Sequence, residues 1–194
     1  LYFIGCGTSY HAASVGAVYF AQLAGRAVIP VLAPQFIPQY APTVNHEDVG
    51  IFVSQSGETK DVLNALEAAE ARGMSCFGLA NVVGSTLTKA TSFSLPLCCG
   101  YEISVPATKT FTNQVVTFLY LAYKLAGRDT RELDGIPELM DKTLEMVEPQ
   151  VKAIAEDING WNDLYCLGYG ATYPIALEGA LKLKEITYAH CEGM

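Results

Sequence analysis

Three hydroxyl side chains lie within the six-residue segment Ser54–Thr59, which reads Ser-Gln-Ser-Gly-Glu-Thr. The segment follows the unbroken apolar run Val49–Val53, so we predict a turn between a buried strand and a helix. Hydroxyls and free amides at a helix N-terminus bind a phosphate dianion, with about 1.5–3 kcal/mol for each hydrogen bond. The alternative is a simple helix cap, but a cap needs one hydroxyl. The turn therefore predicts a phosphate site.

A second glycine-rich turn, Gly5-Cys6-Gly7-Thr8-Ser9, follows the first apolar run of the chain. Thr8 or Ser9 could face the same ligand, although such turns are also ordinary connections between a strand and a helix. The dinucleotide fingerprint is incomplete, because Tyr10 stands at its third glycine position and no acidic residue ends the next strand. The turn alone leaves both interpretations open.

Glu178, Lys182 and Glu185 have the spacing of one helix face and are the candidates for acid–base chemistry. On spacing alone, a solvated face with one ion pair is the preferred interpretation. If the stripe faced a closed site, Glu185 could move a proton between adjacent carbons and Lys182 could assist. The histidines receive structural interpretations, with His11 packed on an apolar helix.

Strand-like apolar runs alternate with helix-compatible segments over residues 1–127. This alternation predicts an α/β fold with a doubly wound parallel sheet flanked by helices. We expect the Pro-rich stretch 30–42 to form no regular helix. The expected strands are 1–4, 27–32, 49–53, 75–80 and 93–97, and the expected helices end near 24, 72 and 126.

The organisation changes after residue 127. Residues 128–160 are charged and predict a helical connector, with Pro137 and Pro149 as breakers. Residues 161–194 repeat the strand, glycine turn and helix of the start of the chain, so we expect the beginning of a second, similar domain that the chain does not finish.

Composition argues against several functions. The chain has a net charge of −8 and no run of Lys or Arg, which argues against nucleic-acid binding. No apolar run is long enough to predict a membrane span. The six cysteines form no C-x-x-C pair and show no ligand spacing with histidine, so no metal site is expected and a reducing cytoplasm is the simplest location.

The chain resembles the sugar isomerase (SIS) family, and within it the isomerase half of the glutamine–fructose-6-phosphate aminotransferases. The resemblance rests on motifs in order along the chain, which are GCGTSYHAA (Gly5–Ala13), SQSGET (Ser54–Thr59), ATKTFTNQ (Ala107–Gln114) and ALEGALKLKEITYAH (Ala176–His190). It implies a flavodoxin-like three-layer sandwich that uses no cofactor.

The resemblance also implies roles for single residues. Glu185 would be the base that moves a proton between C1 and C2 of the sugar, Lys182 would assist it, and Glu178 would support the site. The implied substrate-binding residues are Cys6, Gly7, Thr8, Ser9, Ser54, Gln55, Ser56, Thr59, Val105 and Ala107. These roles reverse the preference for a solvated stripe.

The implied reaction converts fructose-6-phosphate and ammonia into glucosamine-6-phosphate, with ammonia from an N-terminal glutaminase domain and a homodimer as the assembly. The ring-opening His and the Schiff-base Lys of the family lie beyond Met194, so this piece alone is not expected to complete the reaction. Ala107, where many members carry Ser, and Pro106 depart from the pattern. The alternatives are a stand-alone SIS enzyme, such as a glucosamine-6-phosphate deaminase, and a non-catalytic phosphosugar sensor.

Overall fold

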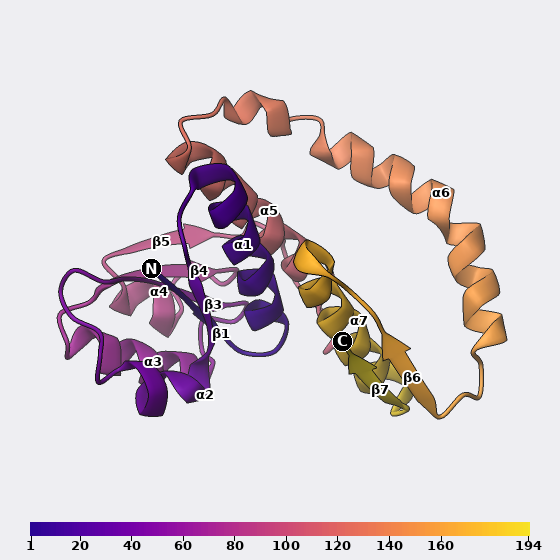
Figure 1. Ribbon diagram of the computed structural model, residues 1–194, viewed down its shortest axis with the longest axis horizontal. Helices are drawn as coiled ribbons and strands as arrows, with labels where there is room; N and C mark the ends of the chain where they lie inside the picture. The colour runs from indigo at the N-terminus through magenta and orange to yellow at the C-terminus, as the bar shows by residue number, and fades with distance from the viewer.

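A five-stranded parallel sheet forms the centre of the computed structural model, which describes residues 1–194 (Figure 1). Its strand order is β2-β1-β3-β4-β5. The order changes direction between β1 and β3, which is where open α/β sheets bind ligands. The strands are β1 (Tyr2–Gly5), β2 (Ile29–Leu32), β3 (Val49–Ser54), β4 (Ser75–Ala80) and β5 (Phe93–Pro96).

Helices cover both faces of this sheet, as the unbroken apolar strands require. On one face, α1 (Thr8–Ala24) and α5 (Lys109–Leu125) lie side by side. The other face packs against α2 (Ala33–Gln35), α3 (Lys60–Glu70) and α4 (Thr86–Ala90). The predicted doubly wound α/β fold is confirmed.

Aromatic packing joins α1 and α5 to the sheet. The fully buried ring of Phe118 on α5 stacks on Phe3 of β1 at 4.5 Å between centroids, and Phe20 of α1 meets Phe3 edge-on at 5.0 Å. Gly16 lets α1 approach this closely, because a Cβ there would collide with the Phe118 side chain. The layer between the sheet and the helices α1 and α5 is therefore a close-packed core.

The Pro-rich stretch forms more helix than the sequence predicts. Pro34 lies in the first turn of α2, where a missing amide proton costs no hydrogen bond. The chain continues into the π-helical turn Phe36–Tyr40, in which the Ala41 amide donates to the Phe36 carbonyl at 2.9 Å. The prediction of no regular helix fails for α2, and the turn after it is irregular. The short helix α4 was not predicted.

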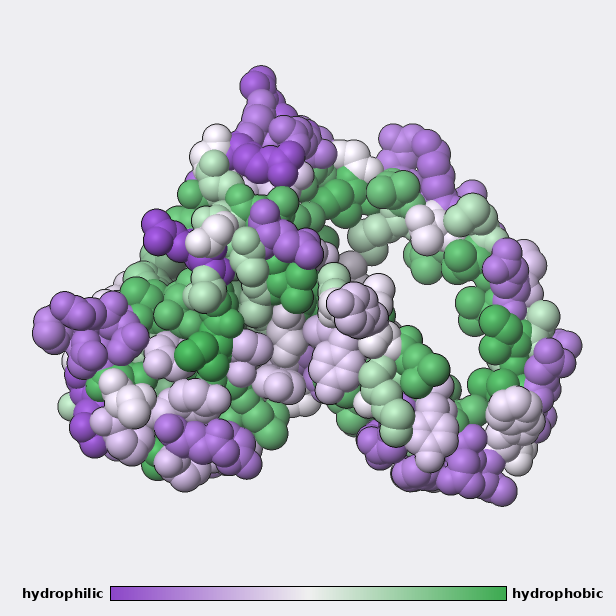
Figure 2. Space-filling model, viewed as in Figure 1, coloured by the Kyte–Doolittle hydropathy of each residue, from purple (hydrophilic) through white to green (hydrophobic).

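The connector contains the short 3-10 helix Thr130–Leu133 and one continuous helix, α6 (Ile136–Asp157). Pro149 lies inside α6, so the prediction of a break there is wrong. A proline removes one amide donor and displaces one carbonyl, and an exposed helix can accommodate both changes by bending. No residue of α6 is buried, and Figure 2 shows apolar surface open to solvent along its arch.

The last segment is a strand–helix–strand unit. It consists of β6 (Asp163–Cys166), the 3-10 turn Gly170–Thr172, α7 (Tyr173–Thr187) and β7 (His190–Gly193), with β6 and β7 paired in parallel. The unit contacts the first sheet's layers through α7, which lies against α1 (Figure 1). The strand β7 was not predicted, since Glu192 and Gly193 break its apolar character.

No helix of the structure combines the length and the apolar character that crossing a bilayer would require.

Replacing Phe118 by Ala should destabilise the protein by about 3–5 kcal/mol, because the ring leaves a cavity between α1, α5 and the sheet. Urea unfolding measures the loss. Phe93→Ala is the matched control, since the Phe93 side chain is 56% exposed. An equal loss for both variants would contradict the assigned core.

Candidate active site

Two turns open side by side at the carboxyl edge of the sheet. One joins β1 to α1 and the other joins β3 to α3. The two strands are parallel neighbours, with Tyr2 opposite Gly50 and Ile4 opposite Phe52. Their carboxyl ends therefore lie together, and so do the hydroxyl-bearing residues that follow them.

Hydrogen bonds within the turn Ser54–Thr59 organise it before any ligand arrives. The hydroxyls of Ser54 and Thr59 lie 2.8 Å apart, and the Ser54 Oγ accepts from the Gly57 amide at 3.0 Å. Gly57 has a φ of +67°, and a Cβ there would collide with the Ser85 side chain. Only glycine fits both requirements.

Several amides around this turn have no acceptor within the protein. The amides of Gln55, Ser56 and Thr59 donate no internal hydrogen bond, and the first turn of α3 carries the usual free amides. Thr59 occupies the N-cap position of α3, yet its hydroxyl does not cap the helix. The turn therefore offers donors and a helix dipole to an anion, and the simple cap is not realised.

The β1–α1 turn brings Thr8 toward α7. Gly7 has a φ of +49°, and a Cβ there would lie 3.9 Å from Leu181 of α7. Ser9 is buried. The Cys6 side chain packs against the core, where burial and the nearby charge of Asp61 raise the pKa of its thiol. Cys6 can thus present its backbone, rather than a thiolate, to a ligand.

The carboxylate of Glu178 is 5% exposed and lies at the contact between α7 and α1. Its Oε1 accepts from the Thr8 hydroxyl at 2.9 Å and lies 3.3 Å from Lys182 Nζ. Its Oε2 lies 2.7 Å from His11 Nδ1. Burial raises the pKa of Glu178, but the hydrogen bonds from His11 and Thr8 and the charge of Lys182 outweigh burial, so the pKa lies below its ordinary value.

Lys182 stands between two carboxylates. Its Nζ donates to the Thr8 hydroxyl at 3.0 Å and lies 2.7 Å from Glu185 Oε2, although the ammonium is not aimed along a hydrogen bond to that oxygen. The side chains of Lys182 and Glu185 are 17% and 26% exposed. The preference for a solvated stripe, drawn from spacing alone, is therefore wrong, because the stripe docks against α1.

The sequence interpretation of His11 missed its partner. His11 is three residues after Thr8, so both side chains point from the same face of α1 toward Glu178. The three-residue spacing of Thr8 and His11 indicates a shared helix face, but the local sequence does not show that α7 packs against this face. His46 is exposed in its loop, and His190 is an exposed neighbour of Asp163 at 3.0 Å.

A family model described as the SIS domain matches residues 1–124. The chain belongs to the SIS domain family. This SIS chain is 42% identical to the glutamine–fructose-6-phosphate aminotransferase (isomerizing) of Methanothermobacter thermautotrophicus, over 98% of its own length and 32% of that protein. It thus spans about a third of the length of the curated relatives that it matches.

Solved structures agree with this membership. The SIS chain matches the C-terminal domain of glucosamine-fructose-6-phosphate aminotransferase from Francisella tularensis with a TM-score of 0.90 and 30% identity, over 100% of this chain and 57% of that one. A glucosamine-6-phosphate deaminase from Thermotoga maritima matches with a TM-score of 0.84 and 24% identity, over 100% and 60% of the two chains, and shares the fold.

Val105 and Ala107 lie in the connection from β5 to α5, which also follows a carboxyl strand end. The Glu102 carboxylate anchors this connection by accepting from the Thr110 amide at 3.0 Å and from the Thr110 hydroxyl at 2.8 Å. The Val105 side chain is 87% exposed. The structure brings Thr8, Glu178, Lys182 and Glu185 into one network, and this network does not include Val105 or Ala107.

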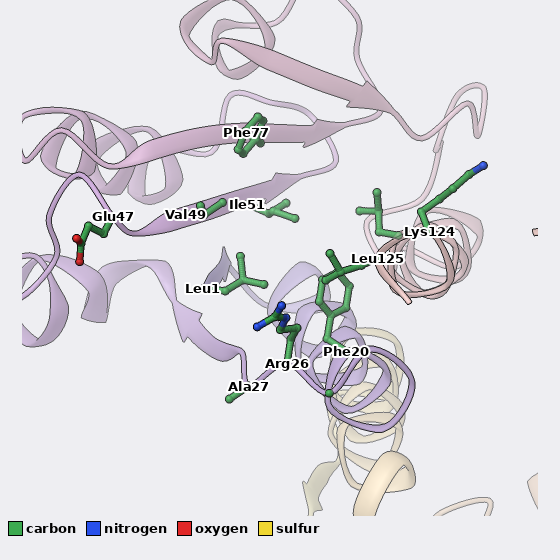
Figure 3. A pocket seen from close by; sticks show the side chains of 12 residues that line it. Leu1, Phe20, Arg26, Ala27, Glu47, Val49, Ile51, Phe77, Lys124 and Leu125 are labelled. Atoms are coloured by element: carbon green, nitrogen blue, oxygen red, sulfur yellow. The ribbon is translucent and has the colours of Figure 1, made fainter. Parts of the chain in front are cut away.

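A hollow of about 860 Å³ lies at the opposite edge of the sheet of this SIS chain (Figure 3). Its walls include Leu1, Val49 and Phe77, and the side chains of Arg26 and Lys124 also line it. The walls are mainly apolar and contain no hydroxyl-rich turn like the one at Ser54–Thr59. No group of three or more His, Cys, Asp or Glu residues is arranged to hold a metal ion.

The lowered pKa of Glu178 should make stability depend on pH. The unfolded carboxyl titrates near 4.5 and the folded one lower, so its stabilisation is fully present above pH 4.5 and is lost as pH falls through the folded value. We therefore expect Glu178→Gln to be less stable than the parent at neutral pH, and the difference to shrink in acid. Urea unfolding across this range measures it.

The matched control is Glu67→Gln on the exposed face of α3, which should follow the parent at every pH. A stability gap for Glu178→Gln that stays constant from neutral to acid pH would show that the ionised Glu178 does not stabilise the fold.

Proposed function

We propose that this SIS domain, within a longer protein, performs the isomerisation that turns fructose-6-phosphate and ammonia into glucosamine-6-phosphate. One observation carries the proposal: a turn rich in hydroxyls and free amides opens beside the turn whose Thr8 joins the Lys182–Glu185 pair. The hydroxyl-rich turn can bind a phosphate, and the Lys182–Glu185 pair can transfer a proton. The printed names of the relatives support the choice of substrate.

In this proposal the two ends of the sugar meet different chemistry. The phosphate accepts from the hydroxyls of Ser54, Ser56 and Thr59 and from the amide of Gln55, while Cys6, Gly7, Thr8 and Ser9 line the sugar. The connection with Val105 and Ala107 closes the sugar site from the β5 side. Neutral donors suit the phosphate because the helix dipole of α3 adds to them.

Proton transfer is assigned to α7. Glu185 takes a proton from one carbon of the C1–C2 pair and returns it to the other. The Lys182 ammonium beside it stabilises the negative charge that develops on the sugar oxygen. Glu178 holds Lys182 in place, as its burial and its contact at 3.3 Å support.

The domain limits and partners belong to the same proposal. Residues 1–127 form the first SIS domain, residues 128–160 the helical connector, and residues 161–194 the beginning of a second SIS domain. The family match over residues 1–124 and the parallel β6–β7 unit support this division. The length of the relatives supports a glutaminase domain elsewhere in the full protein. The homodimer, which the resemblance implies, and the cytoplasmic location, which the cysteine pattern favours, stay predictions.

A stand-alone SIS enzyme that works on the same sugars, such as a deaminase, is the second candidate, and Ala107 and Pro106 favour it. It would use the same phosphate turn and the same Glu185. Turnover of fructose-6-phosphate with glutamine supports the first candidate, and turnover only with free ammonia supports the second.

Fructose-6-phosphate or glucosamine-6-phosphate should raise the melting temperature of the full protein, and unphosphorylated fructose should raise it much less. Ser56→Ala should weaken sugar-phosphate binding by about 10-fold to 100-fold, since a hydrogen bond to a charged group is lost. Ser75→Ala, at the amino end of β4, is the control and should bind normally. Equal shifts with fructose and its phosphate would reject the phosphate turn.

Glu185→Gln should slow isomerisation by about 10²–10⁴-fold, because the amide cannot accept the transferred proton. Sugar-phosphate affinity should change little, since Gln keeps the shape of the side chain. The proton transfer is measured directly as the rate at which the hydrogens on C1 and C2 of the sugar exchange with deuterated water. Glu192→Gln in β7 serves as the control, and unchanged exchange in Glu185→Gln would remove Glu185 from catalysis.

A further inference from the structure

His11, the buried partner of Glu178, has no role in the proton transfer described so far. The side chains of these residues are 13% and 6% exposed, and their atoms Nδ1 and Oε2 lie 2.7 Å apart. The two residues are 167 positions apart in the sequence and come from α1 and α7. Buried polar pairs of this kind specify one arrangement of the groups around them.

His11 is the only partner of one of the two carboxylate oxygens. Oε1 of Glu178 is shared by Thr8 and Lys182, whereas Oε2 meets His11 alone. An ionised carboxylate only accepts hydrogen bonds, so the Nδ1 of His11 must be the donor. Without that donor Oε2 would be a buried acceptor with no partner, and the carboxylate would have to rotate or take up a proton.

Rotation or protonation of Glu178 would change the position of Lys182 relative to Glu185. Lys182 Nζ is held at 3.3 Å from Glu178 Oε1, 3.0 Å from the Thr8 hydroxyl and 2.7 Å from Glu185 Oε2. A rotated or protonated Glu178 would release the ammonium toward Glu185. The base would then be more tightly paired and less available to the substrate.

We propose that His11 is a positioning residue, whose imidazole orients Glu178 so that Glu178 and Thr8 hold Lys182 at the correct distance from Glu185. The inference rests on the proposed function of this site. The charged group that meets His11 is Glu178 from α7, and Tyr10 is its aromatic neighbour on α1 at 5.9 Å between ring centroids. His11 acts through Glu178 and does not itself touch the reacting carbons.

Two substitutions in the full-length protein separate the donor from the ring. His11→Phe keeps an aromatic ring but removes the hydrogen-bond donor. His11→Asn removes the ring but keeps a donor, because its side-chain nitrogen takes the position of Nδ1. We expect His11→Phe to lower kcat by about 10-fold to 100-fold, as a misplaced catalytic group does, with KM for the sugar phosphate nearly unchanged. His11→Asn should recover most of kcat, and His46→Asn in the exposed loop should equal the parent.

Equal loss of kcat in His11→Phe and His11→Asn, or no loss in either, would overturn the proposal. Crystal structures of the parent and both variants test it without relying on turnover. The expected result is a reoriented Glu178 and a shifted Lys182 in His11→Phe only, and unmoved side chains in that variant would overturn the inference. The activity of the parent on fructose-6-phosphate tests the proposed function separately.

Discussion

The buried carboxylate of Glu178 is the group on which the arrangement of the site depends. It lies between α1 and α7 and is stable there only because each oxygen has a partner. The partners Thr8 and His11 are 170 and 167 positions away along the chain. Satisfying this one charge therefore determines how α7 docks on α1, and with it the position of Lys182.

The parallel sheet supplies the second constraint. Because β1 and β3 are neighbours that run in the same direction, their following turns open at one edge. The close-packed layer of Phe3, Phe20 and Phe118 holds α1 rigidly under the first turn. A site assembled from several segments thus rests on a core that lies away from the chemistry.

Charge is distributed unevenly between the two halves of the proposed site. The turn Ser54–Thr59 contains no Lys or Arg and offers hydroxyls, amides and a helix dipole. The Lys182 ammonium lies instead between two carboxylates, near the atoms that would exchange a proton. This division suits a sugar phosphate, whose anionic group and reacting carbons lie at opposite ends of the molecule.

The sequence alone predicts the five-stranded sheet, the helices α1, α3 and α5 and the hydroxyl turn, because strands buried on both faces leave unbroken apolar runs and glycine turns are local. It did not determine that α6 continues through Pro149, since an exposed helix can bend around a lost hydrogen bond. Spacing also placed Glu178 on a solvated face and His11 in a purely packed position. The contact between α1 and α7 shows the true environment of both residues, because the partner of each lies on a helix distant in the sequence and no local pattern encodes which helix faces will meet.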